Sequence, residues 1–226
     1  MKSLAAFVVG TAFALSGNAN PVNFSFSNSL QSTEIKQTGI LGLFNSTLGT
    51  LTGVVLNLKG SISTTFSLSN KDAAAQGISA TDTTQLFFGS SLGALDVLLI
   101  AAKPLLSLSV SSGTQTIGAG QTVNFDPLTS SQTTAPNVTE ILSDFSKTGG
   151  GPFNITCTSK SAVTVPVGNN KSSATQEAQA QCGGDITYTF DVVQPTANRV
   201  PEPTSLALMG LALAGLGLMR RKADKA

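Results

Sequence analysis

Residues 61–69 alternate between small polar and bulkier side chains, and this alternation constrains the fold more than any other feature of the chain. Serine or threonine fills every odd position, and the even positions hold Ile62, Thr64, Phe66 and Leu68. A period of two places the bulkier side chains on one face of a β-strand that is buried on one side. The segment Asp185–Val193 repeats the pattern. Since such a sheet must cover its apolar face with a second layer, the chain is expected to be all-β.

Further short segments with strand character are separated by Gly, Asn and Ser. The expected strands, beyond those two, are Val22–Ser29, Leu51–Lys59, Ile78–Phe88, Leu105–Val110, Thr122–Phe125, Phe153–Thr158 and Ala162–Val167. Lys59 and Gly60 are expected to form a hairpin turn, and Asn70, Lys71 and Asp72 another.

Three segments interrupt this series of strands. Leu128–Asn137 and Gly168–Gln179 are expected to be long loops because they are rich in polar residues. Ser91–Ala102 fits either a short helix or a fully buried strand, and Pro104 closes it in both cases. The sequence therefore predicts an antiparallel β-sandwich over residues 20–194.

Composition excludes several functional classes. The chain has a net charge of +1 and only 11% charged residues, which argues against a nucleic-acid binder. It contains no His, which removes the commonest general base and metal ligand. It also contains no Trp and one Tyr, whereas sugar clefts usually use aromatic platforms. No cofactor is expected.

The N-terminus has the features of a secretory signal peptide over residues 1–19. Lys2 precedes an apolar run from Leu4 to Leu15, and small residues lead to a cleavage site after Ala19. The alternatives are a buried N-terminal helix and an uncleaved membrane anchor. A signal peptide implies the Sec translocon and signal peptidase as partners.

The C-terminus combines a proline-containing segment, an apolar helix and basic residues. Val200, Pro201, Glu202 and Pro203 form an extended segment that a protease can bind as a strand. Residues 206–219 are apolar and span about 21 Å as a helix, which is short for a membrane span. We expect the transmembrane helix at about residues 204–220. Arg220, Arg221 and Lys222 are expected to stay cytoplasmic under the positive-inside rule.

These last residues resemble the PEP-CTERM sorting signal of Gram-negative bacteria that make exopolysaccharide. Pro201, Glu202, Pro203, the apolar helix and the basic end match the signal in order and spacing. The resemblance implies recognition by exosortase, a membrane-embedded cysteine peptidase that removes the tail near the Pro-Glu-Pro element. It also implies an association with exopolysaccharide. The alternative is a single-pass anchor that is never removed.

The central domain carries a second resemblance. Residues 44–51, which lead into the expected strand at Thr52–Leu58, resemble the early motif of the choice-of-anchor E domain, an extracellular bacterial β-domain. The late strand at residues 186–190 resembles the aromatic strand that ends such domains. Because the function of that family is undefined, this resemblance bears on location and fold and not on chemistry.

Cys157 and Cys182 are the only cysteines. An even number in an exported chain predicts a disulfide, and closing a loop of this length stabilises a protein by about 3 kcal/mol. A nucleophilic cysteine is the alternative, but it needs a base and the chain has no His. Two cysteines alone also make a poor zinc site.

The acidic side chains are scattered singly along the chain, without the spacing of a calcium loop. We interpret them as solvated carboxylates of turns and edge strands. In the expected domain they are Glu34, Asp72, Asp82, Asp96, Asp126, Glu140, Asp144, Glu177, Asp185 and Asp191. No catalytic residue and no metal ligand is predicted.

The leading hypothesis is therefore a non-enzymatic surface or extracellular-matrix protein. It is expected to be tethered to the inner membrane as a precursor with a periplasmic domain, and then to reach the cell surface or matrix. The alternatives are a carbohydrate- or protein-binding adhesion module and, with less support, an enzyme.

Overall fold

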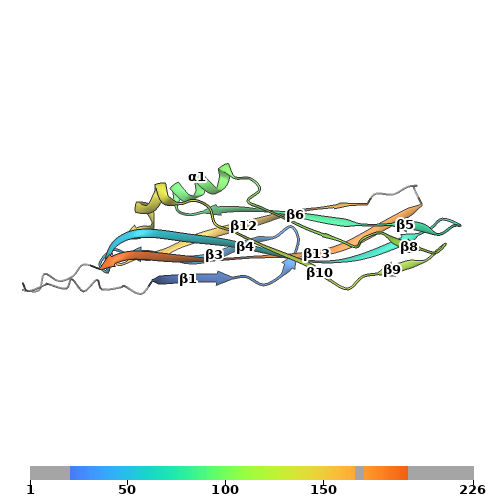
Figure 1. The fold of residues 1–226 in the computed structure, drawn as a ribbon, viewed down its shortest axis with the longest axis horizontal. Coiled ribbons are helices and arrows are strands. Elements are labelled where there is room, and N and C mark those ends of the chain that lie inside the picture. The colour runs from blue at the N-terminus through green and yellow to red at the C-terminus, as the bar shows by residue number, and fades with distance from the viewer. Residues whose placement is uncertain (1–20, 166–170, 193–226) are drawn as a thin grey trace, which may run out of the picture. The chain divides into compact units, whose positions relative to one another are not determined.

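The computed structural model describes residues 21–165 and 171–192. They form two antiparallel sheets that face one another (Figure 1), as the alternating sequence predicts. The expected signal peptide at residues 1–19 and the C-terminal segment at residues 195–226 lie outside the described residues.

Sheet 1 has the spatial order β1, β13, β4 and β10, with β2 beside β13 and β9 beside β4. Its strands are β1 (Val22–Ser27), β2 (Gln31–Ser32), β4 (Gly49–Asn70), β9 (Thr122–Asn124), β10 (Leu128–Thr134) and β13 (Ser172–Val192).

Sheet 2 has the order β11, β3, β12, β6 and β7, and only β11 pairs in parallel. Its strands are β3 (Lys36–Asn45), β6 (Thr81–Ser90), β7 (Leu106–Ser111), β11 (Ser146–Lys147) and β12 (Gly151–Thr164). A separate pair joins β5 (Gln76–Ile78) to β8 (Gln115–Ile117).

The long central strand β4 corrects the predicted hairpin at Lys59 and Gly60. The chain continues straight through both residues, and β4 pairs with β13 along almost its whole length. Gly60 lies on the buried face, where a β-carbon would overlap Cδ1 of Leu86 and stand 3.2 Å from Cδ1 of Leu106. The glycine therefore allows the two sheets to approach closely, and it does not form a turn.

The boundaries of several other elements differ from the expected ones. The first expected loop, Leu128–Asn137, contains β10, and β13 begins at Ser172 within the second, Gly168–Gln179. The two strands expected at Phe153–Thr158 and Ala162–Val167 are joined in the single strand β12, which ends at Thr164, and residues 166–167 lie outside the described residues. Polar strands were missed because their partners are long strands of the same sheet, which supply the backbone hydrogen bonds.

The ambiguous segment Ser91–Ala102 contains a helix, α1 (Gly93–Ala101). Leu95 and Leu99 lie on one side of α1 and are fully buried in the core. A second, 3-10 helix, η1 (Thr139–Phe145), contributes the buried ring of Phe145.

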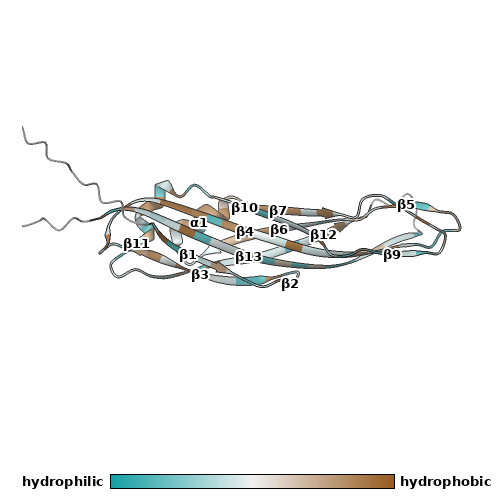
Figure 2. Cartoon of the chain, turned by 60° about the horizontal axis from the view of Figure 1, so that its bottom comes forward, coloured by the Kyte–Doolittle hydropathy of each residue, from teal (hydrophilic) through white to brown (hydrophobic). Residues whose placement is uncertain are grey.

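The core lies between the two sheets. Figure 2 shows apolar bands alternating with polar bands along the long strands, as a half-buried sheet requires. Ile62, Phe66 and Leu68 of β4 are at most 2% exposed, which confirms the face predicted from the sequence. Burying each such side chain contributes about 1.5–3 kcal/mol.

Candidate functional site

The predicted processing residues lie outside the described residues. These are Ala19 at the signal-peptide cleavage site, Val200, Pro201, Glu202 and Pro203 in the sorting motif, and Arg220, Arg221 and Lys222 in the basic end. In the part of the chain that the structure describes, no helix is long and apolar enough to cross a membrane.

Cys157 and Cys182 form the predicted disulfide. Cys157 lies on β12 of sheet 2 and Cys182 on β13 of sheet 1, so the bond joins the two layers of the sandwich. Both residues are 1% exposed, and their Cα atoms are 6.5 Å apart. The Cys182 N–H donates to Oε1 of the buried Gln37 at 2.9 Å. The bond is therefore a structural crosslink, and the alternative of a nucleophilic cysteine is wrong.

An aromatic cluster surrounds Tyr188, the only tyrosine of the chain. The Tyr188 ring is fully buried and contacts the rings of Phe24, Phe44 and Phe145, with centroids 5.8–6.5 Å away. Its hydroxyl donates to the Gly42 carbonyl of sheet 2 at 2.7 Å. Burial raises the pKa of the Tyr188 phenol far above its ordinary value. Tyr188 therefore supports the packing of the two sheets as a neutral hydrogen-bond donor.

Asp82 corrects the interpretation that all the carboxylates are solvated. Its side chain on β6 is fully buried between the sheets. The Thr64 hydroxyl of β4 donates to Asp82 Oδ2 at 2.7 Å, and the Ser161 hydroxyl lies 3.5 Å from Oδ1. The sequence missed this site because Asp82 reaches partners that are remote along the chain. Among the described residues, no group of three acidic, His or Cys side chains could hold a metal ion.

The chain bends after Asn70, but the hairpin expected at Asn70, Lys71 and Asp72 is wrong, because β4 does not pair with the next strand, β5. Asn70 is fully buried, and its side-chain oxygen accepts from the Asp72 N–H at 2.9 Å. Its amide nitrogen donates to the carbonyls of Ala74 and Ile117 at 2.8 and 2.9 Å. Asn70 therefore closes the end of β4 and ties the β5–β8 pair to it.

The outward face of sheet 1 carries mainly hydroxyl and amide side chains on the C-terminal half of β4 and the N-terminal half of β13. We call this surface the hydroxyl face. Cross-strand pairs join Ser61 to Gln181, Ser63 to Gln179 and Thr65 to Glu177. Adjacent strands lie about 4.8 Å apart, and successive outward side chains on one strand lie about 6.7 Å apart. The members are Ser61, Ser63, Thr65, Ser67 and Ser69 of β4 and Ser173, Thr175, Glu177, Gln179 and Gln181 of β13.

Two hollows open on the hydroxyl face. One, of about 590 Å³, is lined by Ser63, Gln179 and the segment Ser32–Thr33, among others. Gln176 also lines it, and its buried Oε1 has no hydrogen-bond partner in the described part of the chain. The other, of about 420 Å³, is lined by Ser61, Gln181 and Gly183, among others. Hollows lined by hydroxyl and amide side chains suit a ligand with many neutral hydroxyl groups.

Lys59 and Asp185 form an ion pair at the edge of the hydroxyl face. Asn57 Nδ2 also donates to Asp185 Oδ2 at 2.7 Å. The hydrogen bonds from Lys59 and then Asn57 lower the pKa of the Asp185 carboxyl below its ordinary value of 3.8. The pair bridges neighbouring strands β4 and β13.

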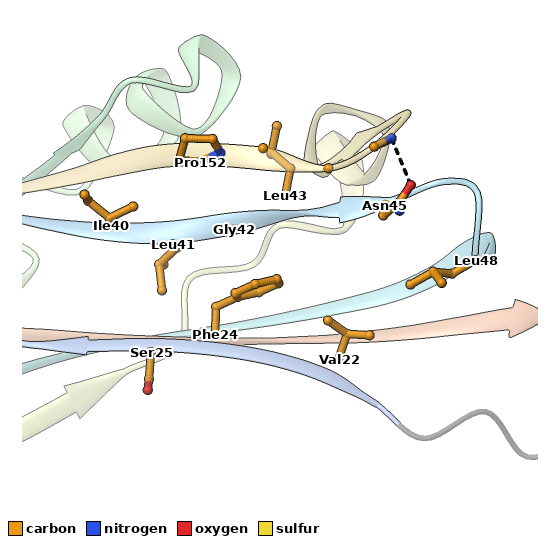
Figure 3. A pocket seen from close by; sticks show the side chains of 13 residues that line it. Val22, Phe24, Ser25, Ile40, Leu41, Gly42, Leu43, Asn45, Leu48 and Pro152 are labelled. Carbon is orange, nitrogen blue, oxygen red and sulfur yellow. Dashed lines mark hydrogen bonds between the residues drawn. The ribbon is translucent and has the colours of Figure 1, made fainter.

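An apolar groove of about 480 Å³ lies between β1 and β3, the strands along one open side of the sandwich (Figure 3). Val22 and Phe24 of β1 point toward β3, and Leu48 lies near the end of the groove. The Phe24 ring packs where Gly42 has no side chain. This close approach, which the sequence did not predict, narrows the groove and leaves Phe24 36% exposed.

Comparison with known families identifies the C-terminal segment. Residues 199–222 match the model of the PEP-CTERM protein-sorting motif. The predicted sorting signal is therefore confirmed, and the chain is a β-sandwich protein that carries this motif. The resemblance of the central domain to the choice-of-anchor E domain stays a prediction.

No curated protein matches the chain. Among solved structures, a protein of Desmodium yellow mottle tymovirus aligns with 12% identity over 87% of this chain and 99% of that one, with a TM-score of 0.22. An infectious bursal disease virus structure (Gx strain) aligns with 10% identity over 87% and 48%, at a TM-score of 0.20. Tobacco streak virus coat protein aligns with 10% identity over 84% and 99%, at a TM-score of 0.19. TM-scores of this size establish no common fold.

Proposed function

We propose that this protein is an exported surface or extracellular-matrix protein that exosortase releases from a membrane-anchored precursor. The observation that carries the proposal is the PEP-CTERM motif at residues 199–222, which follows the β-sandwich. The disulfide between Cys157 and Cys182 supports export, because such bonds persist in oxidising compartments.

The processing steps follow from the two ends of the chain. The Sec translocon exports the chain, and signal peptidase cuts after Ala19. The apolar segment at residues 206–219 then holds the precursor transiently in the inner membrane, with Arg220, Arg221 and Lys222 on the cytoplasmic side. Exosortase finally cuts near Pro201, Glu202 and Pro203.

The test is to replace Pro201, Glu202 and Pro203 together by alanine in a strain that has exosortase. The apolar segment and its basic end remain, so the variant should stay in the inner membrane as a longer chain. The control is the unchanged chain in the same strain and in one that lacks exosortase. Release of the alanine variant at the same rate as the unchanged chain would contradict the proposal.

We further propose that the domain is not an enzyme. The chain has no His to act as a base, and the Asp82 carboxylate is sealed between the sheets. A panel of glycoside and ester substrates should show no turnover with the exported protein. Turnover that disappears when one Asp or Glu is replaced by its amide would contradict this.

The hydroxyl face supports an association with exopolysaccharide. It presents paired rows of hydroxyl and amide groups and the carboxylate of Glu177, which can exchange hydrogen bonds with a hydroxylated polymer. The Ser63→Ala and Gln179→Ala double variant should sediment less with the polysaccharide of the producing strain. The matched control is Thr83→Ala with Thr158→Ala on the outward side of sheet 2. Equal sedimentation of both variants and the unchanged chain would exclude this face and favour the alternative of a protein-binding adhesion module.

A further inference from the structure

The outward side of α1 is apolar, although it faces solvent. Residues 93, 97, 100 and 101 follow one another at helical spacing, and they are Gly93, Val97, Ile100 and Ala101. We call them the α1 stripe. The Val97 side chain is 71% exposed and that of Ile100 is 43% exposed. A surface helix of a soluble domain usually carries polar residues on this side.

The single charged residue of α1 does not make the stripe polar. The Asp96 carboxylate accepts a hydrogen bond from the Ser90 N–H at 2.9 Å, so it is turned toward the end of β6. The opposite side of α1 packs into the core through Leu95 and Leu99. Apart from Asp96, every residue of α1 is glycine or apolar, and only one side of the helix packs into the core.

The register of the strands places α1 in the half of the sandwich where the described chain stops. Val192, the last described residue, pairs with Gly49 at the start of β4. The turn before Gly49 connects to β3, whose Leu43 pairs with Gly151 at the start of β12. Four residues farther along β12, Ile155 pairs with Ser90, which leads into α1 (Figure 1).

Five of the eight other exposed large apolar side chains of the described residues lie in the same half of the sandwich, and Leu30, Val123 and Val163 lie elsewhere. The five are Phe24, Ile40, Leu48, Val55 and Val192, each 36–63% exposed. The other half of sheet 1, away from α1, carries the hydroxyl face. Most of the exposed large apolar side chains therefore lie in the half of the domain that contains α1 and the end of the described chain.

The chain that follows Val192 is short. About 13 residues separate Val192 from the apolar segment that begins at Leu206. Even fully extended, they reach at most about 45 Å. A tether of this length keeps the domain near any bilayer that holds the apolar segment, so a weak contact with lipid becomes effectively intramolecular.

We infer that the α1 stripe contacts the lipid bilayer while the precursor is anchored, an inference that rests on the proposed membrane-anchored precursor. Val97 and Ile100 enter the interface between headgroups and acyl chains. Lys103, exposed just after the helix, lies among the headgroups. The α1 stripe has no side-chain hydrogen-bonding group that would orient a protein partner, and a lipid surface requires none. The contact is lost when the tether is cut, because the local lipid concentration then falls.

The absence of tryptophan from the chain gives a clean probe. Val97→Trp introduces a single reporter at a position of the α1 stripe whose side chain is 71% exposed. The matched control is Val163→Trp, an exposed valine on β12 that pairs with Asp82 and lies away from α1. Each full-length variant is reconstituted into vesicles of phosphatidylethanolamine and phosphatidylglycerol, with and without brominated acyl chains. Flotation first establishes that the chain is anchored.

The expected result is a blue-shifted emission from Trp at position 97 that brominated lipid quenches, and an unshifted, unquenched emission from position 163. Adding Ile100→Asp should abolish the shift at position 97 without releasing the chain from the vesicles. A floating chain whose position 97 stays in water overturns the inference and leaves the proposed function intact. A blue shift without quenching also overturns it, because a protein surface then covers the α1 stripe. A chain that does not float refutes the membrane anchor itself, and the lipid contact with it.

Discussion

Gly60 of β4 lies directly beneath the side chain of Leu86 of β6, so that a β-carbon on Gly60 would overlap Leu86 Cδ1. The two residues belong to opposite sheets, and their contact sets how closely the layers approach. A missing side chain on one sheet thus accommodates a large one on the other, which is how a close-packed interior is filled.

Gly60→Ala should therefore destabilise the domain by about 1–3 kcal/mol through overpacking. The matched control is Gly53→Ala on the same strand, where the new β-carbon would lie 3.6 Å from Thr189 Cβ in ordinary contact. Denaturant unfolding of both variants measures the difference. Equal stabilities would show that Leu86 can move aside without cost.

The disulfide should be fully formed in the exported protein. Labelling of denatured, unreduced chain should find no free thiol at Cys157 or Cys182. Replacing both cysteines by serine should lower the free energy of unfolding by about 3 kcal/mol, because the crosslink restricts a loop of about 25 residues in the unfolded chain. Two reactive thiols in the exported protein would contradict the assignment.

Tyr188 should remain protonated as long as the domain is folded. Its folded pKa is raised by burial, so the stability that it contributes is complete below its ordinary pKa of 10.0 and falls as the pH rises above that value. Because it is the only tyrosine, absorbance of the tyrosinate reports this group alone. Ionisation should coincide with alkaline unfolding. Titration near pH 10 without unfolding would show that the ring is open to water.

The pair between Lys59 and Asp185 should produce a small acid-dependent loss of stability. The folded pKa of Asp185 is lowered, so its contribution is complete above the ordinary value of 3.8 and is lost as the pH falls through the lower folded value. Lys59 is half-exposed, which limits the effect to about 0.5–1 kcal/mol. Asp185→Asn should therefore be less stable than the unchanged chain at pH 7 and equally stable at strongly acidic pH. An equal difference at both pH values would assign the effect to packing.

The sequence predicts the fold class correctly, but it predicts the boundaries of the individual strands less well. Alternation at residues 61–69 identifies a half-buried strand because the burial pattern of a sheet has the same period. The pattern wrongly predicts a turn at Gly60. This position lies inside a strand and is occupied by glycine because Leu86 of the other sheet fills the space of a side chain. The pattern also fails for β3, whose buried face includes Gln37 and Gly39 in place of large apolar residues.

Some of the candidate sites could be predicted from the sequence and others could not. The even number of cysteines predicts the disulfide, and the residues of the sorting motif are contiguous. Both features can therefore be recognised from the sequence alone. The hollows on the hydroxyl face and the buried site of Asp82 arise only when distant strands are brought into register. No local pattern contains that register, so the sequence could not identify these sites.

The C-terminus of the mature protein tests the central claim most directly. Mass spectrometry of protein recovered from outside the inner membrane, in a strain that has exosortase, should find a chain that ends near Val200–Pro203. It should lack the apolar segment and Arg220, Arg221 and Lys222. A chain that extends intact through Ala226 would contradict the account and define a permanently anchored protein.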